Sequence, residues 1–489
     1  MALISVSNLT FAYEGSYDNI FENVGFQLDT DWKLGFTGRN GRGKTTFLNL
    51  LLGNYNYNGI ISSPCGFEYF PFEIKNQKIP VSNIIENICP DFLEWELMRE
   101  FSMLELEPGE EILRRSFETL SYGEQTKVLL AALFLKQNRF LLIDEPTNHL
   151  DIRGREVVAG YLKGKKGFIL VSHDRAFLDG CIDHVLSINK NNIEVQKGNF
   201  SSWLINKERR DNFELAENIK LKKEVKRLEK SAREKAEWAN RTEASKIGAY
   251  DKGYIGHKAA KMMKRSKVIE SRQKTAIEEK SKLLKNIETS ESLKINQRDY
   301  HSGRFVNLDG VSIYYGDKII CKDISFTVNK GDRIALKGRN GSGKSSVIKL
   351  ICGEDIKYTG GFHKGPRLAI SYVSQDTSYL TGSLGEYIKD NNLDESLFKA
   401  ILRKLDFLRI QFEKDLTDFS GGQKKKVLIA KSLCEKSHLL VWDEPLNYID
   451  VISRMQIEDL LLEYKPTVLF VEHDVTFCEN IATKTVELF

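Results

Sequence analysis

The sequence predicts an α/β protein made of two tandem copies of one domain. Aligning the chain with itself at an offset of 299 or 300 residues brings GRNGRGKT at 38–45 over GRNGSGKS at 338–345, and IDEPTNHLD over WDEPLNYID. Internal similarity at a constant offset indicates a duplicated unit. In each copy, short β-rich runs such as FILVSHD and VLFVEHD alternate with longer amphipathic stretches. That alternation is typical of mainly parallel sheets covered by helices.

Size and composition allow two or three separate cores and argue against several classes of protein. The chain has 489 residues, of which 41% are hydrophobic and 29% charged. No apolar run approaches the roughly 18 residues that a membrane span needs, and the first residues, MALISVSNLTF, lack the pattern of a secretory signal. The 7 cysteines show no paired spacing of the kind that zinc or iron–sulfur sites use. We therefore expect a cytoplasmic protein that contacts no membrane.

The segment between the copies, residues 206–300, differs in charge from both. It carries 26 Lys and Arg against 16 Asp and Glu, although the whole chain has a net charge of only +4. This local excess favours a polyanionic partner. Apolar residues recur near heptad spacing at 221–232 and 269–287, with a glycine-containing stretch between them. We predict a helical hairpin over 206–300, with its tip near 245–260, between a first domain at 1–205 and a second at 301–489.

In both copies a predicted strand leads into a glycine-rich loop, GxxGxGK[ST], and then into a helix. The glycines allow backbone N–H groups to approach phosphate oxygens, and the helix N-terminus favours negative charge. The lysine is expected to reach the β- and γ-phosphates, and the hydroxyl after it to bind Mg²⁺. The sequence therefore predicts ATP with Mg²⁺ at each loop. The candidate residues are Gly38, Asn40, Gly41, Gly43, Lys44, Thr45 and Thr46 in the first copy, and Gly338, Asn340, Gly341, Gly343, Lys344, Ser345 and Ser346 in the second.

Each lysine is followed, 99 or 100 residues later, by an apolar run that ends in Asp-Glu. Asp144 and Asp443 are predicted to help hold Mg²⁺, and Glu145 and Glu444 to polarise the attacking water during ATP hydrolysis. Either glutamate alone is equally well explained as a helix cap or a salt-bridge partner at a turn. Its recurrence in both DEP sequences favours the catalytic interpretation.

The segments LSYGEQ at 120–125 and FSGGQK at 419–424 resemble the signature motif of ATP-binding-cassette proteins. The resemblance implies two tandem P-loop ATP-binding-cassette domains, joined by the long α-helical hairpin linker, that close on each other around two ATP molecules within a monomer. In that family the signature of one cassette completes the ATP site of the other. Ser121, Gly123 and Glu124 would then complete the site of Lys344. Ser420, Gly422 and Gln423 would complete the site of Lys44.

The same resemblance assigns four more residues. His173 in SHD and His473 in EHD match the switch histidine of the family, and Tyr13 and Tyr315 fall where the family stacks an aromatic ring on adenine. An isolated histidine or tyrosine is more often an ordinary packed residue. The two histidines are nevertheless assigned to catalysis, because each lies in the matching sequence context of its copy.

One expected Mg²⁺ position differs between the copies. The glutamine of the family is Gln375 in YVSQD, whereas the first copy has Phe72 in YFPFE. A phenylalanine binds neither a metal nor water, so we expect the two ATP sites to be non-equivalent.

Two fused cassettes with a charged hairpin between them resemble the ABC-F family of ribosome-binding ATPases over essentially the whole chain. Members bind the exit site of the bacterial ribosome and push the interdomain arm toward the peptidyl-transferase region. Residues 244–268 carry seven Lys or Arg against a single Asp, a composition suited to phosphate contact and base stacking. A solvated coiled coil with a flexible turn is the plainer alternative. The candidate contacts to large-subunit rRNA are Tyr250, Lys252, Tyr254, His257, Lys258, Lys261, Lys264 and Arg265.

Within that family the chain looks most like the antibiotic-resistance branch, and most of all its lincosamide, streptogramin A and pleuromutilin group. Neither copy has room for the inserted arm of the housekeeping factors, because Phe72 to Ser121 is 49 residues and Gln375 to Ser420 is 45. The expected function is ATP-dependent ribosome binding that displaces peptidyl-site tRNA and drug, with release on hydrolysis. The alternatives are a housekeeping ABC-F translation factor, the paired nucleotide-binding subunit of a membrane importer, and a DNA-organising ATPase of the cassette superfamily.

Overall fold

The computed structural model of the chain describes residues 2–14, 19–148, 150–189, 192–244, 271, 293, 295, 298–339 and 341–488. These residues form two compact units. One consists of Met1–Ser201 together with Ser290–Phe489, and the other of Ser202–Thr289. Both copies of the repeat lie in the first unit.

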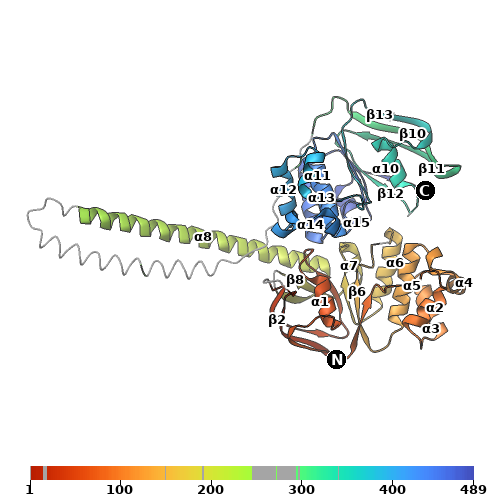
Figure 1. Cartoon of the computed structure of the whole chain (residues 1–489), viewed down its shortest axis with the longest axis horizontal. Coiled ribbons are helices and arrows are strands. Elements are labelled where there is room, and N and C mark those ends of the chain that lie inside the picture. The colour runs from red at the N-terminus through yellow and green to blue at the C-terminus, as the bar shows by residue number, and fades with distance from the viewer. Residues whose placement is uncertain are drawn as a thin grey trace, which may run out of the picture. The chain divides into compact units, whose positions relative to one another are not determined.

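The first copy begins with three strands, which helices and further strands follow (Figure 1). Its strands are β1 (Leu3–Phe11), β2 (Phe21–Asp29), β3 (Lys33–Thr37), β4 (Asn58–Ser62), β5 (Gly66–Phe70), β6 (Arg139–Asp144), β7 (Phe168–Val171), β8 (His184–Ile188) and β9 (Ile193–Lys197). Its helices are α1 (Lys44–Leu51), α2 (Val81–Ile88), α3 (Glu94–Met103), α4 (Gly109–Arg114), α5 (Tyr122–Phe134), α6 (Ile152–Lys163) and α7 (Arg175–Cys181), with a 3₁₀ turn at Phe117–Thr119.

The second copy repeats most of this order of elements. Its strands are β10 (Arg304–Tyr315), β11 (Lys318–Asn329), β12 (Arg333–Lys337), β13 (Lys357–Lys364), β14 (Ile370–Val373), β15 (Leu439–Asp443), β16 (Val468–Val471) and β17 (Lys484–Glu487). Its helices are α10 (Lys344–Cys352), α11 (Leu384–Asp390), α12 (Glu395–Lys404), α13 (Gly421–Cys434), α14 (Val451–Tyr464) and α15 (Val475–Ile481), with 3₁₀ turns at Arg409–Glu413 and Leu416–Asp418.

A mainly parallel sheet organises each copy. The strand order is β5-β6-β7-β3-β8-β9 in the first copy, where only the β8–β9 pair is antiparallel. It is β14-β15-β16-β12-β17 in the second, where every pair is parallel. Each strand of the second sheet has a counterpart at the same place in the first. The predicted α/β class and the duplication are therefore confirmed.

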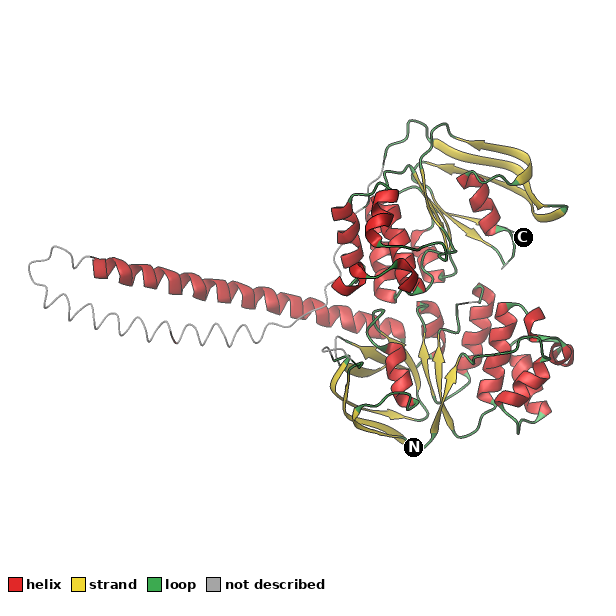
Figure 2. Cartoon of the chain, viewed as in Figure 1, coloured by secondary structure: helices red, strands yellow, loops and turns green. Residues whose placement is uncertain are grey.

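A small antiparallel sheet, not predicted from the sequence, accompanies each parallel one. Its strand order is β2-β1-β4 in the first copy and β11-β10-β13 in the second. In the first copy a buried apolar cluster joins the two sheets through α1, with Val6 from β1, Phe36 from β3 and Phe47 from α1. Figure 2 shows α1 between the two sheets. The helix that follows the phosphate loop is thereby fixed on two sides.

Helix α8 (Phe200–Ala244) leaves the first copy and runs into the second unit. Its 45 residues correspond to about 68 Å at 1.5 Å per residue. The first arm of the expected hairpin is thus helical. The tip near 245–260 and most of the return arm lie outside the described residues. None of the described helices combines the length and apolar character that crossing a bilayer requires.

Candidate ATP-hydrolysis sites

The carboxyl ends of parallel strands meet at one edge of a sheet, and ligands of open α/β sheets bind there. In the first copy β3 ends at the phosphate loop, β6 ends at Asp144, and β7 ends two residues before His173. The second copy has the same arrangement at the ends of β12, β15 and β16. Residues about 100 positions apart in the sequence are therefore brought together at this edge.

Lys44 and Lys344 each open the helix that follows their loop, and both are buried. The Nζ of Lys44 donates to the carbonyl of Gly38 at 2.7 Å, and the Nζ of Lys344 donates to that of Gly338 at 2.8 Å. Burial lowers the pKa of both lysines. A phosphate anion at the loop would stabilise the charged form of each.

Gly43 and Gly343, the residues before these lysines, meet two separate requirements for glycine. Their φ angles are 92° and 88°, in the left-handed region that side chains rarely adopt. A Cβ on Gly43 would also lie 2.6 Å from Cγ2 of Ile20, and one on Gly343 would lie 3.0 Å from Cγ2 of Ile320. The loop conformation therefore depends on glycine at these positions.

Asp144 stands beside the hydroxyl that follows Lys44. Its Oδ2 accepts hydrogen bonds from Oγ1 of Thr45 at 3.3 Å and from the hydroxyl of Tyr69 at 3.1 Å. Burial raises the pKa of Asp144, while the bond from Tyr69 opposes that shift. A hydroxyl and a carboxylate held this close are hard oxygen donors of the kind that Mg²⁺ prefers.

The second copy fits Mg²⁺ in the same way. Asp443 is 1% exposed, and its Oδ1 is a buried atom without a hydrogen-bond partner, which a bound cation would satisfy. Ser345 hydrogen bonds to this carboxyl group. Ser345 and Gln375 both line a pocket over the second phosphate loop. Mg²⁺ held there would neutralise charge on the β- and γ-phosphates.

In the first copy, both the backbone conformation of Glu145 and the pKa of its side chain depart from their ordinary values. Its φ of 50° is unusual for a residue with a side chain and marks a constrained position. Its Oε1 lies 3.3 Å from Nε2 of His173. Burial, with a further contribution from Asp144, raises the pKa of Glu145 to about 8, and burial lowers the pKa of His173 well below its ordinary value.

Glu444 has the same backbone conformation, with a φ of 48°, but different neighbours. Its Oε2 accepts hydrogen bonds from Gln375 at 2.8 Å and from Asn447 at 2.6 Å, and its Oε1 lies 3.4 Å from Nε2 of His473. Burial by itself would raise the pKa of Glu444, as it does that of Glu145. The contacts with His473, Lys425 and Gln375 outweigh it and hold the pKa of Glu444 below its ordinary value.

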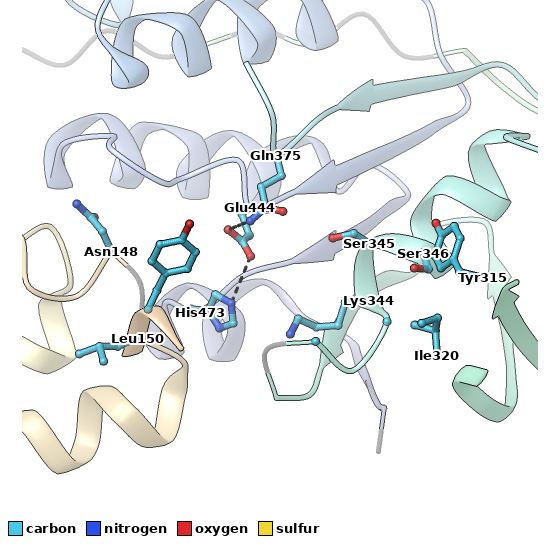
Figure 3. Close-up of a pocket in the computed structure, with 13 residues that line it drawn as sticks. Asn148, Leu150, Tyr315, Ile320, Lys344, Ser345, Ser346, Gln375, Glu444 and His473 are labelled. Atoms are coloured by element: carbon cyan, nitrogen blue, oxygen red, sulfur yellow. Dashed lines mark hydrogen bonds and ion pairs between the residues drawn. The ribbon is translucent and has the colours of Figure 1, made fainter. Parts of the chain in front are cut away.

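A pocket of about 560 Å³ lies over the second phosphate loop. Figure 3 shows Lys344 and Ser345 on one side of it, with Gln375, Glu444 and His473 grouped beside them. Asn148 and Leu150 of the first copy lie across from them, and Tyr315 and Ile320 close the far end. The pocket lining also contains Gly341, Gly343, Ser346 and Tyr122.

The two signature segments begin helices. Ser121 accepts a hydrogen bond from the backbone of Glu124 as the N-cap of α5, and Ser420 caps α13 in the same way with Gln423. Each forms a capping box, in which the side chain three residues on bonds back to the cap. The expected helix N-termini are therefore present in both copies.

Residues from the two copies meet at both phosphate loops. The Nδ2 of Asn40 donates to the carbonyl of Tyr448 at 2.7 Å, and a Cβ on Gly422 would lie 3.2 Å from that same Nδ2. At the second loop it is Tyr122, rather than Ser121, Gly123 or Glu124, that the described pocket lining includes. The structure thus brings the second signature to the first loop through Gly422 and the first signature to the second loop through Tyr122.

The expected adenine-stacking tyrosines differ in their contacts. The hydroxyl of Tyr13 hydrogen bonds to Oγ1 of Thr46 at 2.7 Å, and its ring meets that of Tyr55 edge to face, with 5.7 Å between centroids. Tyr315 lines the second pocket. Asn340 and the candidate RNA contacts Tyr250, Lys252, Tyr254, His257, Lys258, Lys261, Lys264 and Arg265 lie outside the described residues.

Several residues that the structure places at the sites were not predicted from the sequence. Tyr122 and Asn148 line the second pocket, and Asn447 and Lys425 stand beside Glu444. Tyr122 had a sequence signal, because it replaces the Gly421 of the second signature. Asn148 and Asn447 occupy the same place in the two DEP segments.

The phosphate loops, the Asp-Glu strand ends and the signature helices define a tandem P-loop ATPase of the ATP-binding-cassette type. A family model described as ABC transporter matches residues 21–148 and 321–447, just over half of the chain. The chain therefore belongs to the ABC transporter family, and within it to the ABC-F type of ATP-binding protein.

Relatives align over nearly the whole chain. The ribosome protection protein VmlR of Bacillus subtilis is 28% identical over 98% of this chain and 85% of its own length. The ATP-binding protein Uup of Buchnera aphidicola subsp. Acyrthosiphon pisum is 29% identical over 99% of this chain and 80% of its own. The ABC transporter F family member 5 of Arabidopsis thaliana is 25% identical over 99% and 75%.

Solved structures share the architecture at lower identity. The archaeal ribosome recycling factor aABCE1, in complex with the stalk protein aP1, matches with a TM-score of 0.64 and 19% identity, over 98% of this chain and 87% of that one. A structure of RNase-L Inhibitor matches with a TM-score of 0.63 at 19% identity over the same shares. At this identity the matches establish the common two-cassette fold.

Proposed function

We propose that this chain binds the bacterial ribosome at the exit site in its ATP-bound form and directs residues 206–300 toward the peptidyl-transferase region. There it displaces peptidyl-site tRNA and large-subunit antibiotics. Hydrolysis through Glu145 and Glu444, with His173 and His473, then releases it. In this proposal the protein acts in the cytoplasm as a monomer, with ATPase domains at 1–205 and 301–489.

The observation that carries this proposal is the alignment with a named ribosome protection protein over 98% of this chain and 85% of that protein. The alignment includes residues 206–300, where 26 Lys and Arg face 16 Asp and Glu. A basic segment of this kind suits an rRNA partner, whose backbone is a polyanion. It supports contact by the predicted tip residues.

The contacts between the cassettes support ATP-controlled closure. Asn40 reaches the backbone of Tyr448, and Tyr122 reaches the pocket of Lys344. An ATP molecule at either loop would therefore touch both copies and favour the conformation in which they are paired. The closed form is the one proposed to fit the ribosome.

The first experiment separates binding from release. In the Glu145→Gln, Glu444→Gln double variant, ATP still binds but the general bases are gone, so the protein should sediment with 70S ribosomes in ATP and not in ADP. The wild type under the same conditions is the control. Unchanged ATP turnover together with no ATP-dependent sedimentation would refute the assignment.

The second experiment tests whether the protein protects cells against ribosomal antibiotics. Expression in a susceptible host should raise the inhibitory concentrations of a lincosamide, a streptogramin A and a pleuromutilin, and leave that of a cell-wall inhibitor unchanged. The triple variant Tyr250→Ala, Tyr254→Ala, His257→Ala should keep ATPase activity and lose protection. Phe213→Ala, which removes an aromatic ring that is 69% exposed on α8, is the matched control and should keep both.

A housekeeping ABC-F translation factor is the second candidate, because the ATP-binding protein Uup, whose name mentions no protection of the ribosome, aligns over as much of this chain. It predicts the same trapped ribosome complex but no change in drug susceptibility. A growth defect on deletion without any drug would also support it. The two assays therefore distinguish the candidates.

A further inference from the structure

Lys425 is a lysine buried beside the second ATP site. It belongs to α13, the signature helix, and is only 2% exposed. Fully buried lysines are rare unless their charge is compensated. Its Nζ donates to the backbone carbonyl of Ser374 at 2.8 Å and approaches that of Asp443 at 3.3 Å.

These two carbonyls lie at the ends of neighbouring strands. Ser374 directly follows β14, and Asp443 is the last residue of β15. The strands are paired in parallel up to this point, with Val373 opposite Trp442. The ammonium group of Lys425 therefore connects the two strand ends where the hydrogen-bonded ladder stops.

The next residue on each strand end belongs to the site. Gln375 follows Ser374, Glu444 follows Asp443, and the Nε2 of Gln375 donates to Oε2 of Glu444 at 2.8 Å. Lys425 and the Gln375–Glu444 hydrogen bond thus close a ring of contacts across the two strand ends. Either contact limits how far the other can move.

The first copy has neither of these side chains at the corresponding positions. Thr126 stands at the place of Lys425, and its hydroxyl donates within its own helix to the carbonyl of Tyr122 at 2.9 Å. Phe72 stands at the place of Gln375. A cavity of about 250 Å³, lined by Pro71, Phe72, Thr126 and Glu145 among others, lies in this region.

We propose that Lys425 is a positioning residue of the second ATP site, holding the strand end that carries Gln375 against the strand end that carries Glu444. The first site has threonine at this position. The inference rests on the assignment of Glu444 to hydrolysis made above, and it does not depend on the ribosomal partner.

The test uses the full chain with Glu145→Gln, so that turnover reports the second site. Lys425→Met keeps the unbranched side chain and removes the ammonium group. Lys425→Arg keeps a cation with several donors. Lys431→Met makes the same change on the same helix, at a lysine whose Nζ lies 3.6 Å from Glu435. The measurements are kcat and KM for ATP, with the thermal midpoint of each variant.

Misplacement of a reacting group by about 1 Å costs on the order of a hundredfold in rate. We expect Lys425→Met to lower kcat by about 10- to 100-fold with KM changed less than about threefold. Lys425→Arg should recover most of the loss, and Lys431→Met should equal the parent. If Lys425→Met does not accumulate as folded protein, Lys425→Gln takes its place with the same expected result.

Unchanged kcat in Lys425→Met, or a loss that Lys425→Arg does not recover, would overturn the inference. Adding Glu444→Gln to the Glu145→Gln parent distinguishes this failure from a wrong catalytic assignment. If turnover persists in that double variant, the assignment of Glu444 is wrong. If turnover stops while Lys425→Met is fully active, only the role of Lys425 is wrong.

Discussion

The side-chain amide of Gln375 donates to Oε2 of Glu444 at 2.8 Å, and this contact has no equivalent at Glu145 because Phe72 takes the place of the glutamine. The ring of Phe72 instead faces the ammonium group of Lys136, which lies 5.3 Å from its centroid. The pKa values of the two glutamates are also shifted in opposite directions. The pKa of Glu145 is raised to about 8 by burial, whereas that of Glu444 is held below its ordinary value.

The first prediction follows from this difference. A general base must be ionised, so hydrolysis at the first site should rise as the pH passes through about 8. In Glu444→Gln, where the first site alone turns over, ATPase activity should increase about tenfold from pH 7 to pH 9. In Glu145→Gln it should stay nearly constant from pH 6 to pH 9. Parallel profiles for the two variants would show that the glutamates share one environment.

The second prediction concerns the amide itself. Gln375→Phe gives the second site the residue of the first, and in the Glu145→Gln parent it should lower kcat by about tenfold or more, since Glu444 loses an oriented donor. Phe72→Leu in the same parent changes only the first copy and should leave kcat within about twofold. Steady-state ATPase measurements decide between these outcomes. Equal activity of Gln375→Phe and its parent would mean that the amide does not orient Glu444.

The third prediction concerns a buried ion pair between the second signature helix, α13, and the N-cap of α14. The Nζ of Lys426 lies 2.9 Å from Oδ2 of Asp450, and both side chains are at most 4% exposed. Lys426→Met leaves Asp450 buried without its cation, so unfolding should become easier by about 3–5 kcal/mol. The exposed pair Lys399–Glu395 provides the control, because Lys399→Met should change the free energy of unfolding far less than Lys426→Met does. Thermal and denaturant unfolding measure both, and similar losses would contradict the burial argument.

The fourth prediction concerns the first phosphate loop. Gly43→Ala places a Cβ at a φ of 92° and 2.6 Å from Ile20, so it should deform the loop and lower ATP affinity at that site by at least about tenfold. Gly160 of α6 offers open space, because a Cβ there would have no heavy atom within 4 Å apart from its chain neighbours and the nearby backbone of its own helix. Gly160→Ala should therefore stabilise the helix by about 0.5–1 kcal/mol and leave ATP affinity unchanged. Binding of a fluorescent ATP analogue and thermal unfolding test the pair.

Much of the fold and of the phosphate-binding sites was predictable because their signals are local. The loop GxxGxGK[ST] needs glycine where the backbone turns left-handed, and Gly43 and Gly343 have positive φ angles as that requirement implies. Buried strands such as β6 read as apolar runs, so the position of Asp144 at a strand end followed from the sequence. The antiparallel sheets could not be predicted in this way. Buried and exposed residues alternate irregularly along their strands, and shifts in register interrupt the pairing.

The sequence by itself determined that this protein is duplicated, that each half binds a phosphate chain at a glycine-rich loop, and that Phe72 breaks the symmetry. Repeats, motifs and the need for glycine at left-handed backbone positions all depend on residues that are close together in the sequence. Only the tertiary structure decided that Tyr122 lines the pocket of Lys344, that Lys425 joins two strand ends, and that burial and Asp144 raise the pKa of Glu145. Those facts depend on strand order and on exclusion of water, which arise when distant segments pack together.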